Sequence, residues 1–207
     1  TWIHGYMSMP RSFGQYSRTL QDLKSVEATS TLNSLLSRRT PVPEPALNPA
    51  YEDLLLFAEH TFGMAMSHGH SGTWRYDDDF LAHRALGDYD MIEHSWQEKE
   101  DHVLQAARRT VPALQKHLAA LAANVNVEGN RIIVYNPLPY PRSGMVELRA
   151  HSGTGIRALK DAATGELVPL ENKDNVYRFE VRNVPGMGYR TYVPSDAPAS
   201  AKTTAVS

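Results

Sequence analysis

The spacing of the apolar residues changes near residue 124, and this change constrains the fold more than any other feature of the sequence. Before it, apolar residues recur at three- and four-residue steps over long segments, which is the pattern of amphipathic helices. After it, short apolar runs alternate with turns rich in Pro, Gly, Asn and Asp, which is the pattern of β-strands. The sequence therefore predicts α and β structure in separate parts, an antiparallel three-helix bundle followed by a partial antiparallel β-sandwich.

Three helices are predicted from this periodicity and from residues that favour helix starts. Ser12 can cap the first helix, and Asn48 before Pro49 is typical of the start of the second. Pro112 should kink or split the third helix, because proline removes a backbone hydrogen bond and clashes with the preceding turn. The predicted helices cover residues 12–39, 48–60 and 88–123, with a stiff proline-rich linker at 41–45 and a polar loop at 68–80.

Six short strands are predicted in the second part of the chain, with hairpin turns at Gly165 and at residues 173–175. The strands cover residues 131–135, 144–150, 155–159, 167–170, 176–181 and 189–193. We expect a helical domain over residues 1–125 that includes an N-terminal loop, a β-domain over 126–194 and a disordered tail over 195–207. Six strands over about 65 residues are few for a complete sandwich, and the chain starts at Thr1, so we expect a piece of a longer protein.

Composition excludes several classes of function. The 207 residues carry a net charge of −2 with no basic cluster, which argues against nucleic-acid binding. No apolar run approaches the about 18 residues of a membrane-spanning helix, so no membrane partner is expected. Cysteine is absent, so any metal must be bound by His, Asp or Glu. The sequence leaves the localisation open between the cytoplasm and the periplasm or exterior of a bacterium.

Four stretches, in this order and spacing, resemble glycoside hydrolase family 38, the α-mannosidases. "WIHGYMSMPRSFGQYSRTLQDLKSVEATSTL" (2–32) resembles the aromatic-rich loop that leads into the first bundle helix, and "LLLFAEHTFG" (54–63) resembles the second bundle helix. "RIIVYNPLPYPRSGMVELRA" (131–150) and "VPGMGYRTYVP" (184–194) resemble strands of the C-terminal β-domain. The Glu-His-Thr form with "TWIHG" is more similar to a divergent bacterial branch than to the standard mannosidases.

The resemblance implies a zinc-dependent retaining glycosidase whose N-terminal catalytic domain is missing from this chain or lies on a separate one. That domain carries the aspartate nucleophile and two or three of the zinc ligands in the family, so no catalytic residue is expected here. The implied partners are a carbohydrate substrate, an α-mannoside or related α-glycoside, and the catalytic domain itself. Zinc in such enzymes binds sugar hydroxyls and favours an oxocarbenium-like transition state. This chain alone is expected to be inactive.

Three residues are the expected site residues under this resemblance. His60 falls on the histidine zinc ligand of the family, Trp2 on an aromatic residue that lines the sugar pocket, and Thr61 on a substrate-binding position. The family usually has Asp where this chain has Thr61. A hydroxyl can still hydrogen-bond a sugar but adds no charge, which leaves the exact substrate open. Glu59 is a candidate for orienting the imidazole of His60.

Each of these interpretations has a plainer alternative. In the plainer interpretation, His60 is a histidine near a helix end whose ring is bonded to a backbone carbonyl. Trp2 then has no role beyond anchoring its loop to the bundle. His68 and His70 could bind a metal together with an aspartate from 77–79, but this spacing is not a standard zinc pattern and a solvated loop is simpler. Calcium binding by the three aspartates is a further, weaker possibility. The remaining histidines look like surface or internally satisfied residues: His83, His94, His102, His117 and His151.

The alternative function is a non-catalytic structural or interaction module, in which the helices support a β-domain that binds a partner. The two hypotheses differ in where His60 lies. A free imidazole that shares a cleft with Trp2 favours the enzyme, whereas a ring packed into the bundle core favours the module.

Overall fold

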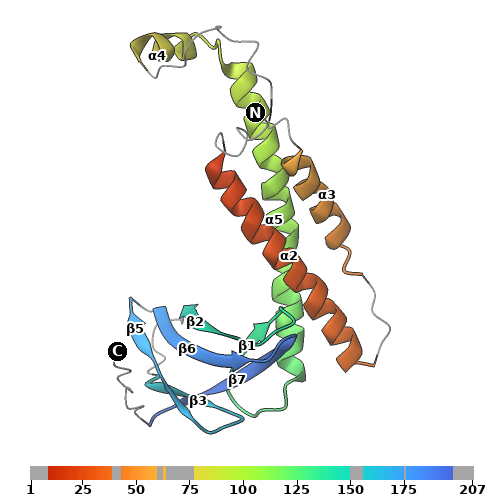
Figure 1. Ribbon diagram of the computed structural model, residues 1–207, viewed down its shortest axis with the longest axis vertical. Coiled ribbons are helices and arrows are strands. Elements are labelled where there is room, and N and C mark those ends of the chain that lie inside the picture. Colours follow the sequence, from red (N-terminus) through yellow and green to blue (C-terminus); the bar gives the residue numbers. More distant parts are fainter. Residues whose placement is uncertain are drawn as a thin grey trace. The chain divides into compact units, whose positions relative to one another are not determined.

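The computed structural model describes residues 9–38, 43–59, 63, 77–149, 156–174 and 176–197. Within these ranges it contains four helices, followed by strands that form two antiparallel sheets, so α and β structure lie in separate parts as predicted (Figure 1). The chain divides into two compact units, Thr1–Ala120 and Leu121–Ser207. No helix in the described ranges is long and apolar enough to span a membrane.

Three of the helices enclose one hydrophobic core. Helices α2 (Pro10–Leu36), α3 (Leu47–Ala58) and α5 (Asp90–Asn124) lie side by side in Figure 1, whereas the short α4 (Asp78–Ala85) contributes no buried residue. Each of the three gives apolar side chains at helical spacing to this core, which confirms the helical periodicity. The buried core residues are Met9, Leu23, Val26, Leu47, Ala50, Leu54, Phe57, Val103, Ala106 and Ala113.

The helix starts differ from those predicted. Helix α2 starts at Pro10, and the buried Ser12 is not its cap; its hydroxyl donates to the Glu100 carboxylate on α5 at 2.9 Å. Helix α3 starts at Leu47, which puts Pro49 third in the helix. A proline is tolerated there because the first four backbone N–H groups of a helix have no partner within it.

Two further predictions about the helices need correction. Of the two effects predicted for Pro112, a kink or a split, the split does not occur, because α5 runs unbroken through Pro112 and a helix of 35 residues tolerates one missing hydrogen bond. The loop predicted at 68–80 overlaps α4, which starts at Asp78. Asp77 caps that helix by accepting from the backbone N–H of Phe80 at 3.1 Å, and Asp78 and Asp79 lie in its first turn, where the helix dipole favours acidic residues.

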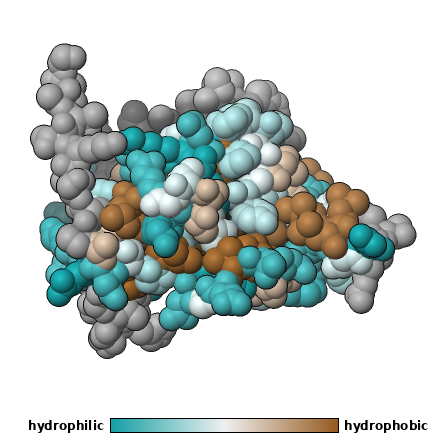
Figure 2. Space-filling view, turned by 90° about the horizontal axis from the view of Figure 1, so that it is seen from below, coloured by the Kyte–Doolittle hydropathy of each residue, from teal (hydrophilic) through white to brown (hydrophobic). Residues whose placement is uncertain are grey.

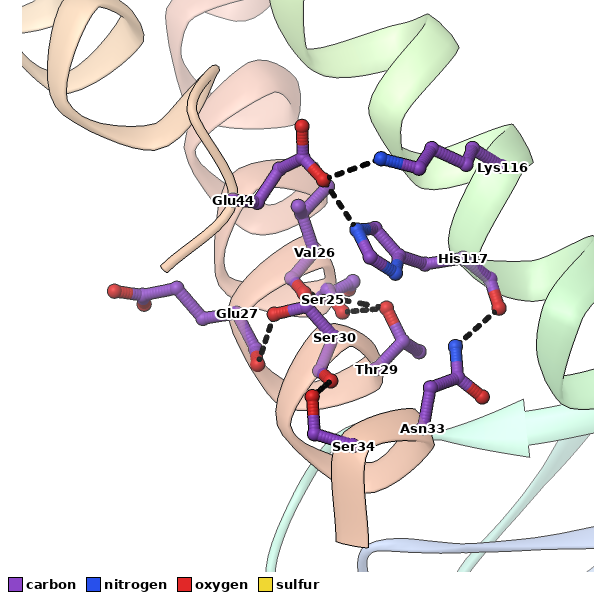
Figure 3. Close-up of polar contacts among 10 residues, drawn as sticks. All are labelled: Ser25, Val26, Glu27, Thr29, Ser30, Asn33, Ser34, Glu44, Lys116 and His117. Carbon is purple, nitrogen blue, oxygen red and sulfur yellow. Dashed lines mark hydrogen bonds and ion pairs between the residues drawn. The ribbon is translucent and has the colours of Figure 1, made fainter. Parts of the chain in front are cut away.

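Polar contacts fix the segment before α3 to α5. Glu44 accepts hydrogen bonds from Lys116 at 2.9 Å and from His117 at 2.7 Å, and its side chain is only 11% exposed (Figure 3). The bond from Lys116 is the main reason that the pKa of Glu44 is lowered; burial opposes this effect and the bond to His117 adds to it. Nearby, the amide nitrogen of Asn33 on α2 donates to the backbone carbonyl of His117 at 2.8 Å.

The hydroxyl groups near this contact are satisfied within their own helix. Thr29 donates to the carbonyl of Ser25 at 2.6 Å, and Ser30 donates to the carbonyl of Glu27 at 3.0 Å (Figure 3). Buried hydroxyls of this kind cost little because their hydrogen-bonding groups stay paired. These two hydroxyls therefore stabilise α2 internally, and the contact to α5 is made by Asn33 and Glu44.

The strands form two sheets that share a second core. The four-stranded sheet has the order β1-β7-β3-β4 and the three-stranded sheet β2-β6-β5, all antiparallel. Side chains from both sheets, such as Leu159 and Tyr192 from one and Phe179 and Val181 from the other, form one cluster. The described strands are β1 (Ile132–Asn136), β2 (Arg142–Arg149), β3 (Ala158–Asp161), β4 (Leu167–Pro169), β5 (Glu171–Lys173), β6 (Val176–Val184) and β7 (Gly188–Ser195).

The strand predictions were mostly correct. Strand β5 was missed, because its three exposed residues, Glu171–Lys173, show no apolar alternation. The hairpin at Gly165 is confirmed by the β3–β4 pairing, and the turn at 173–175 by the pairing of Lys173 with Val176. The expected tail at 195–207 lies mostly outside the described residues, although β7 extends to Ser195.

Asn136 and Gly186 join β1 and the turn that follows it to residues 184–186 at the end of β6. The amide nitrogen of Asn136 donates to the carbonyls of Tyr140, Val184 and Pro185 at 2.8–3.2 Å, and its oxygen accepts from Leu138. A Cβ atom on Gly186 would lie 2.4 Å from the backbone of Pro139, so no other residue fits there. These residues are therefore explained by the fold.

Both polar and apolar side chains cover the surface. The face drawn in Figure 2 shows hydrophobic residues in brown among hydrophilic residues in teal. Large apolar side chains are exposed in both units, for example Leu55 at 71%, Leu86 at 78% and Met145 at 61%. Several leucines and valines of the predicted helices therefore lie outside the core. The apolar face of each helix is wider than the part of it that the neighbouring helices cover.

We predict that Gly186→Ala lowers the free energy of unfolding of the β-unit by at least about 2 kcal/mol, because the new methyl group overlaps rigid backbone. Gly144→Ala is the matched control, since a Cβ atom there meets nothing within 4 Å. Urea denaturation followed by circular dichroism measures both. Equal effects of the two substitutions would contradict the close packing at Gly186.

We also predict that Glu44→Gln lowers the free energy of unfolding by about 1–2 kcal/mol near neutral pH, because it removes the charged partner of Lys116 and His117. The lowered pKa of Glu44 means that its carboxylate contributes stability above the ordinary value of 4.5, and that this contribution is lost as the pH falls through the lower pKa of the folded state. The difference from wild type should therefore disappear in acid. Glu52→Gln, an exposed control on α3, should have no such effect; a pH-independent difference for Glu44→Gln would refute the assignment.

Candidate functional site

A groove of about 540 Å³ lies between the start of α2 and the first part of α5. We call it the α2–α5 groove. Residues 9–12 form one wall and Arg84, at the end of α4, contributes to the rim. Helix α5 contributes the other wall, formed by Glu93, Trp96, Gln97 and Glu100.

The charged groups of the α2–α5 groove are held in place by neighbours. Arg84 donates to both carboxylate oxygens of Glu93, at 2.7 and 3.3 Å, and this carboxylate raises the pKa of Arg84. The buried hydroxyl of Ser12 donates to Glu100 at 2.9 Å. Trp96 is half-buried and packs against the bundle core, so its ring has little freedom to move. The groove thus combines a fixed aromatic wall with oriented donors and acceptors.

The residues on either side of the predicted zinc ligand both contact α5. Glu59 ends α3, and Lys99 donates to its carboxylate at 3.1 Å and to the backbone carbonyl of Leu56 at 2.7 Å. Gly63 has φ +93°, and a Cβ atom there would lie 2.7 Å from the hydroxyl of Ser95 and 2.8 Å from the ring of Trp96. The chain on both sides of residues 60–62 is therefore fixed beside the α2–α5 groove.

The expected site residues themselves, Trp2, His60 and Thr61, lie outside the described residues, as do His68 and His70. One related expectation was wrong: the second helix does not carry Glu59, because α3 ends at Ala58 and Glu59 has extended backbone angles, φ −55° and ψ 135°. Glu59 bonds Lys99, so within the described contacts its carboxylate holds the chain to α5.

The described histidines are surface or internally bonded residues, as predicted. His83 is bonded to Asp88 at 2.6 Å, which raises its pKa, and His117 is bonded to Glu44. His102 lies 3.7 Å from Asp53, and His94 is exposed. His151 lies outside the described ranges.

The described part of the chain does not hold a metal site. Across those ranges, no group of three His, Asp or Glu residues is placed so that it could bind a metal ion. The aspartates at 77–79 cap and begin α4, which accounts for them without calcium. A zinc ion therefore does not fit the described residues alone.

Sequence reasoning missed the α2–α5 groove, although the sequence contains its signal. Glu93, Trp96, Gln97 and Glu100 are spaced at i, i+3, i+4 and i+7, which places them on one face of a helix. Trp96 fits the apolar periodicity that predicts the helix over residues 88–123, and this periodicity alone does not point to the polar residues on the same face. The opposite wall comes from the start of α2, more than 80 positions earlier in the chain, and only the fold brings the two together.

We predict that Gly63→Ala changes the environment of Trp96, because the added methyl group must displace the Ser95 hydroxyl or the indole ring. The shift of the Trp96 indole N–H signal in NMR spectra measures this. Gly129→Ala is the control, since Gly129 has a similar φ of +78° but open space around it. Both substitutions should cost about 1 kcal/mol for the left-handed backbone. An unchanged indole signal in Gly63→Ala would show that Gly63 does not pack on Trp96.

The lining of the α2–α5 groove limits what it can bind. Its fixed aromatic ring, its carboxylates and its guanidinium groups can bind a small polar ligand, but they include no arrangement that identifies a reaction. Comparison of the chain with protein-family models, with curated proteins and with solved structures found no match.

Proposed function

We propose that this chain is the helical and early β portion of a zinc-dependent retaining glycoside hydrolase that acts on α-mannosides or related α-glycosides. In this proposal an N-terminal catalytic domain, in the same longer protein or on a separate chain, supplies the nucleophile and the other zinc ligands. His60 supplies one ligand, and Trp2 and Thr61 contact the sugar.

The observation that carries the proposal is the anchoring of the chain around His60. Glu59 is bonded to Lys99 and Gly63 packs on Trp96, so both flanks of "HTF" are fixed to α5 next to the α2–α5 groove. A metal ligand needs such support, because its direction must be set by rigid neighbours.

The architecture supports the proposal as well. The resemblance predicts a helical bundle followed by a β-sandwich domain, and the chain has these two parts in this order. Within the β-unit, Asn136 bonds the backbone of residues 184 and 185 and Gly186 packs against Pro139, so the two stretches that resemble the family lie against each other.

Each group has a distinct role in the proposed enzyme. His60 and ligands from the catalytic domain would hold the zinc ion, which would supply Lewis-acid chemistry toward sugar hydroxyls. The described residues of this chain hold Glu59 and Gly63, and they form the aromatic and polar lining of the α2–α5 groove. Carboxylates of the catalytic domain would perform the proton transfers and the attack on the anomeric carbon. Among the described residues, no pair of carboxylates is assigned as acid and nucleophile.

The test uses the protein together with its catalytic domain, either as the longer chain or coexpressed. We expect one zinc per molecule by elemental analysis and hydrolysis of an aryl α-mannoside with retention of the anomeric configuration. His60→Ala should remove the zinc and lower kcat/KM by at least about 100-fold, because even the loss of a residue that only orients a ligand costs about 10- to 100-fold.

His94→Ala is the matched control, since His94 is an exposed histidine on α5, and it should keep both zinc and activity. Zinc retained in His60→Ala would refute the role of His60. A protein with neither zinc nor hydrolysis would leave the alternative, a non-catalytic structural or interaction module.

A further inference from the structure

We infer that the α2–α5 groove is a binding subsite for a neutral sugar unit, with Trp96 as its apolar wall. The choice of a mannose-containing ligand rests on the proposed function; the assignment of a neutral polyhydroxyl ligand does not. Neither the resemblance nor the expected site residues assign any role to Trp96.

The size of the groove suits a small ligand. Its volume of about 540 Å³ lies within the range of pockets that bind small molecules, about 300–1,000 Å³. It is lined by residues from the start of α2 and from α5, both of which belong to the same packed helical unit. The walls are therefore rigid elements, which lowers the ordering cost of binding.

The charges of the groove favour a neutral ligand. Two arginines, Arg11 and Arg84, and two glutamates, Glu93 and Glu100, line it, so their formal charges cancel. A phosphate or carboxylate ligand would need an excess of positive charge, and a cation would need an excess of negative charge. The pairing of Arg84 with Glu93 compensates these charges further.

The polar groups match hydroxyls, which both donate and accept. Each ionised carboxylate has about four acceptor positions, so Glu93 and Glu100 can accept from a ligand while they keep their bonds to Arg84 and Ser12. The exposed amide of Gln97 offers both a donor and an acceptor. An acyl chain or an aromatic ligand would leave these groups without partners when it displaced water.

Trp96 completes the match with a sugar. Sugars present apolar C–H faces as well as hydroxyls, and an indole is a large apolar surface that costs little to hold in place. Contact with the bundle core and with Gly63 fixes the Trp96 side chain. A polar rim beside one rigid aromatic ring therefore fits a pyranose better than it fits a purely polar or purely apolar ligand.

The test is an NMR titration of the complete chain, labelled with nitrogen-15, with α-linked mannobiose. We expect shifts in the amides of residues 9–12 and 93–100 and in the Trp96 indole N–H. Trp96→Ala should weaken binding about tenfold. Because Trp96 also packs on the core, Gln97→Ala is the second variant: it should weaken binding about threefold with an unchanged melting temperature.

Tyr140→Ala is the control, since it removes an exposed aromatic ring from the β-unit and should leave binding unchanged. Shifts absent at the groove, or binding unaltered in both groove variants, would overturn the inference. Tighter binding of mannose 6-phosphate than of mannose would overturn the neutral character of the site. The wild-type protein with its catalytic domain separates the two proposals: sugar binding at the groove in a wild-type protein that has neither zinc nor hydrolysis supports the groove and refutes the enzyme.

Discussion

Helix α5 is the surface on which the rest of the helical unit is assembled. Its apolar residues face α2 and α3 in one core. Its polar residues bind the end of α3, the start of α2 and the segment before α3. Lys99 fixes the end of α3, Glu100 bonds the start of α2, and Lys116 and His117 hold Glu44. Because these ties are spaced along one rigid helix, the groove and the flanks of His60 have fixed positions relative to each other.

Periodicity predicted most of the fold, because the burial of apolar side chains produces both the helices and the strands. Elements held by other forces were missed. Helix α4 is defined by an Asp77 cap and acidic residues in its first turn, and β5 is defined by pairing with β6. The start of the first helix was also predicted wrongly. Ser12 is a good capping residue by type, but its hydroxyl donates to Glu100 on α5, which lies 88 positions further along the chain.

The candidate site could be predicted only in part, for a related reason. The resemblance supplied His60, Trp2 and Thr61, which stay predictions because they lie outside the described residues, whereas the contacts of Glu59 and Gly63 show how the chain before and after residues 60–62 is held. The α2–α5 groove needed the fold, since its walls come from segments far apart in the sequence. Trp96 shows the difficulty: its spacing fits an apolar stripe, and it does pack against the core, yet the same residue lines the groove.

The central claim is that the chain around His60 is anchored to α5 so that His60 can bind zinc. Anomalous diffraction at the zinc edge, from crystals of the protein with its catalytic domain, tests this most directly. We predict a zinc peak about 2.1 Å from an imidazole nitrogen of His60, on the side of the bundle that carries the α2–α5 groove. A zinc ion bound without His60, or no zinc at all, would contradict the account.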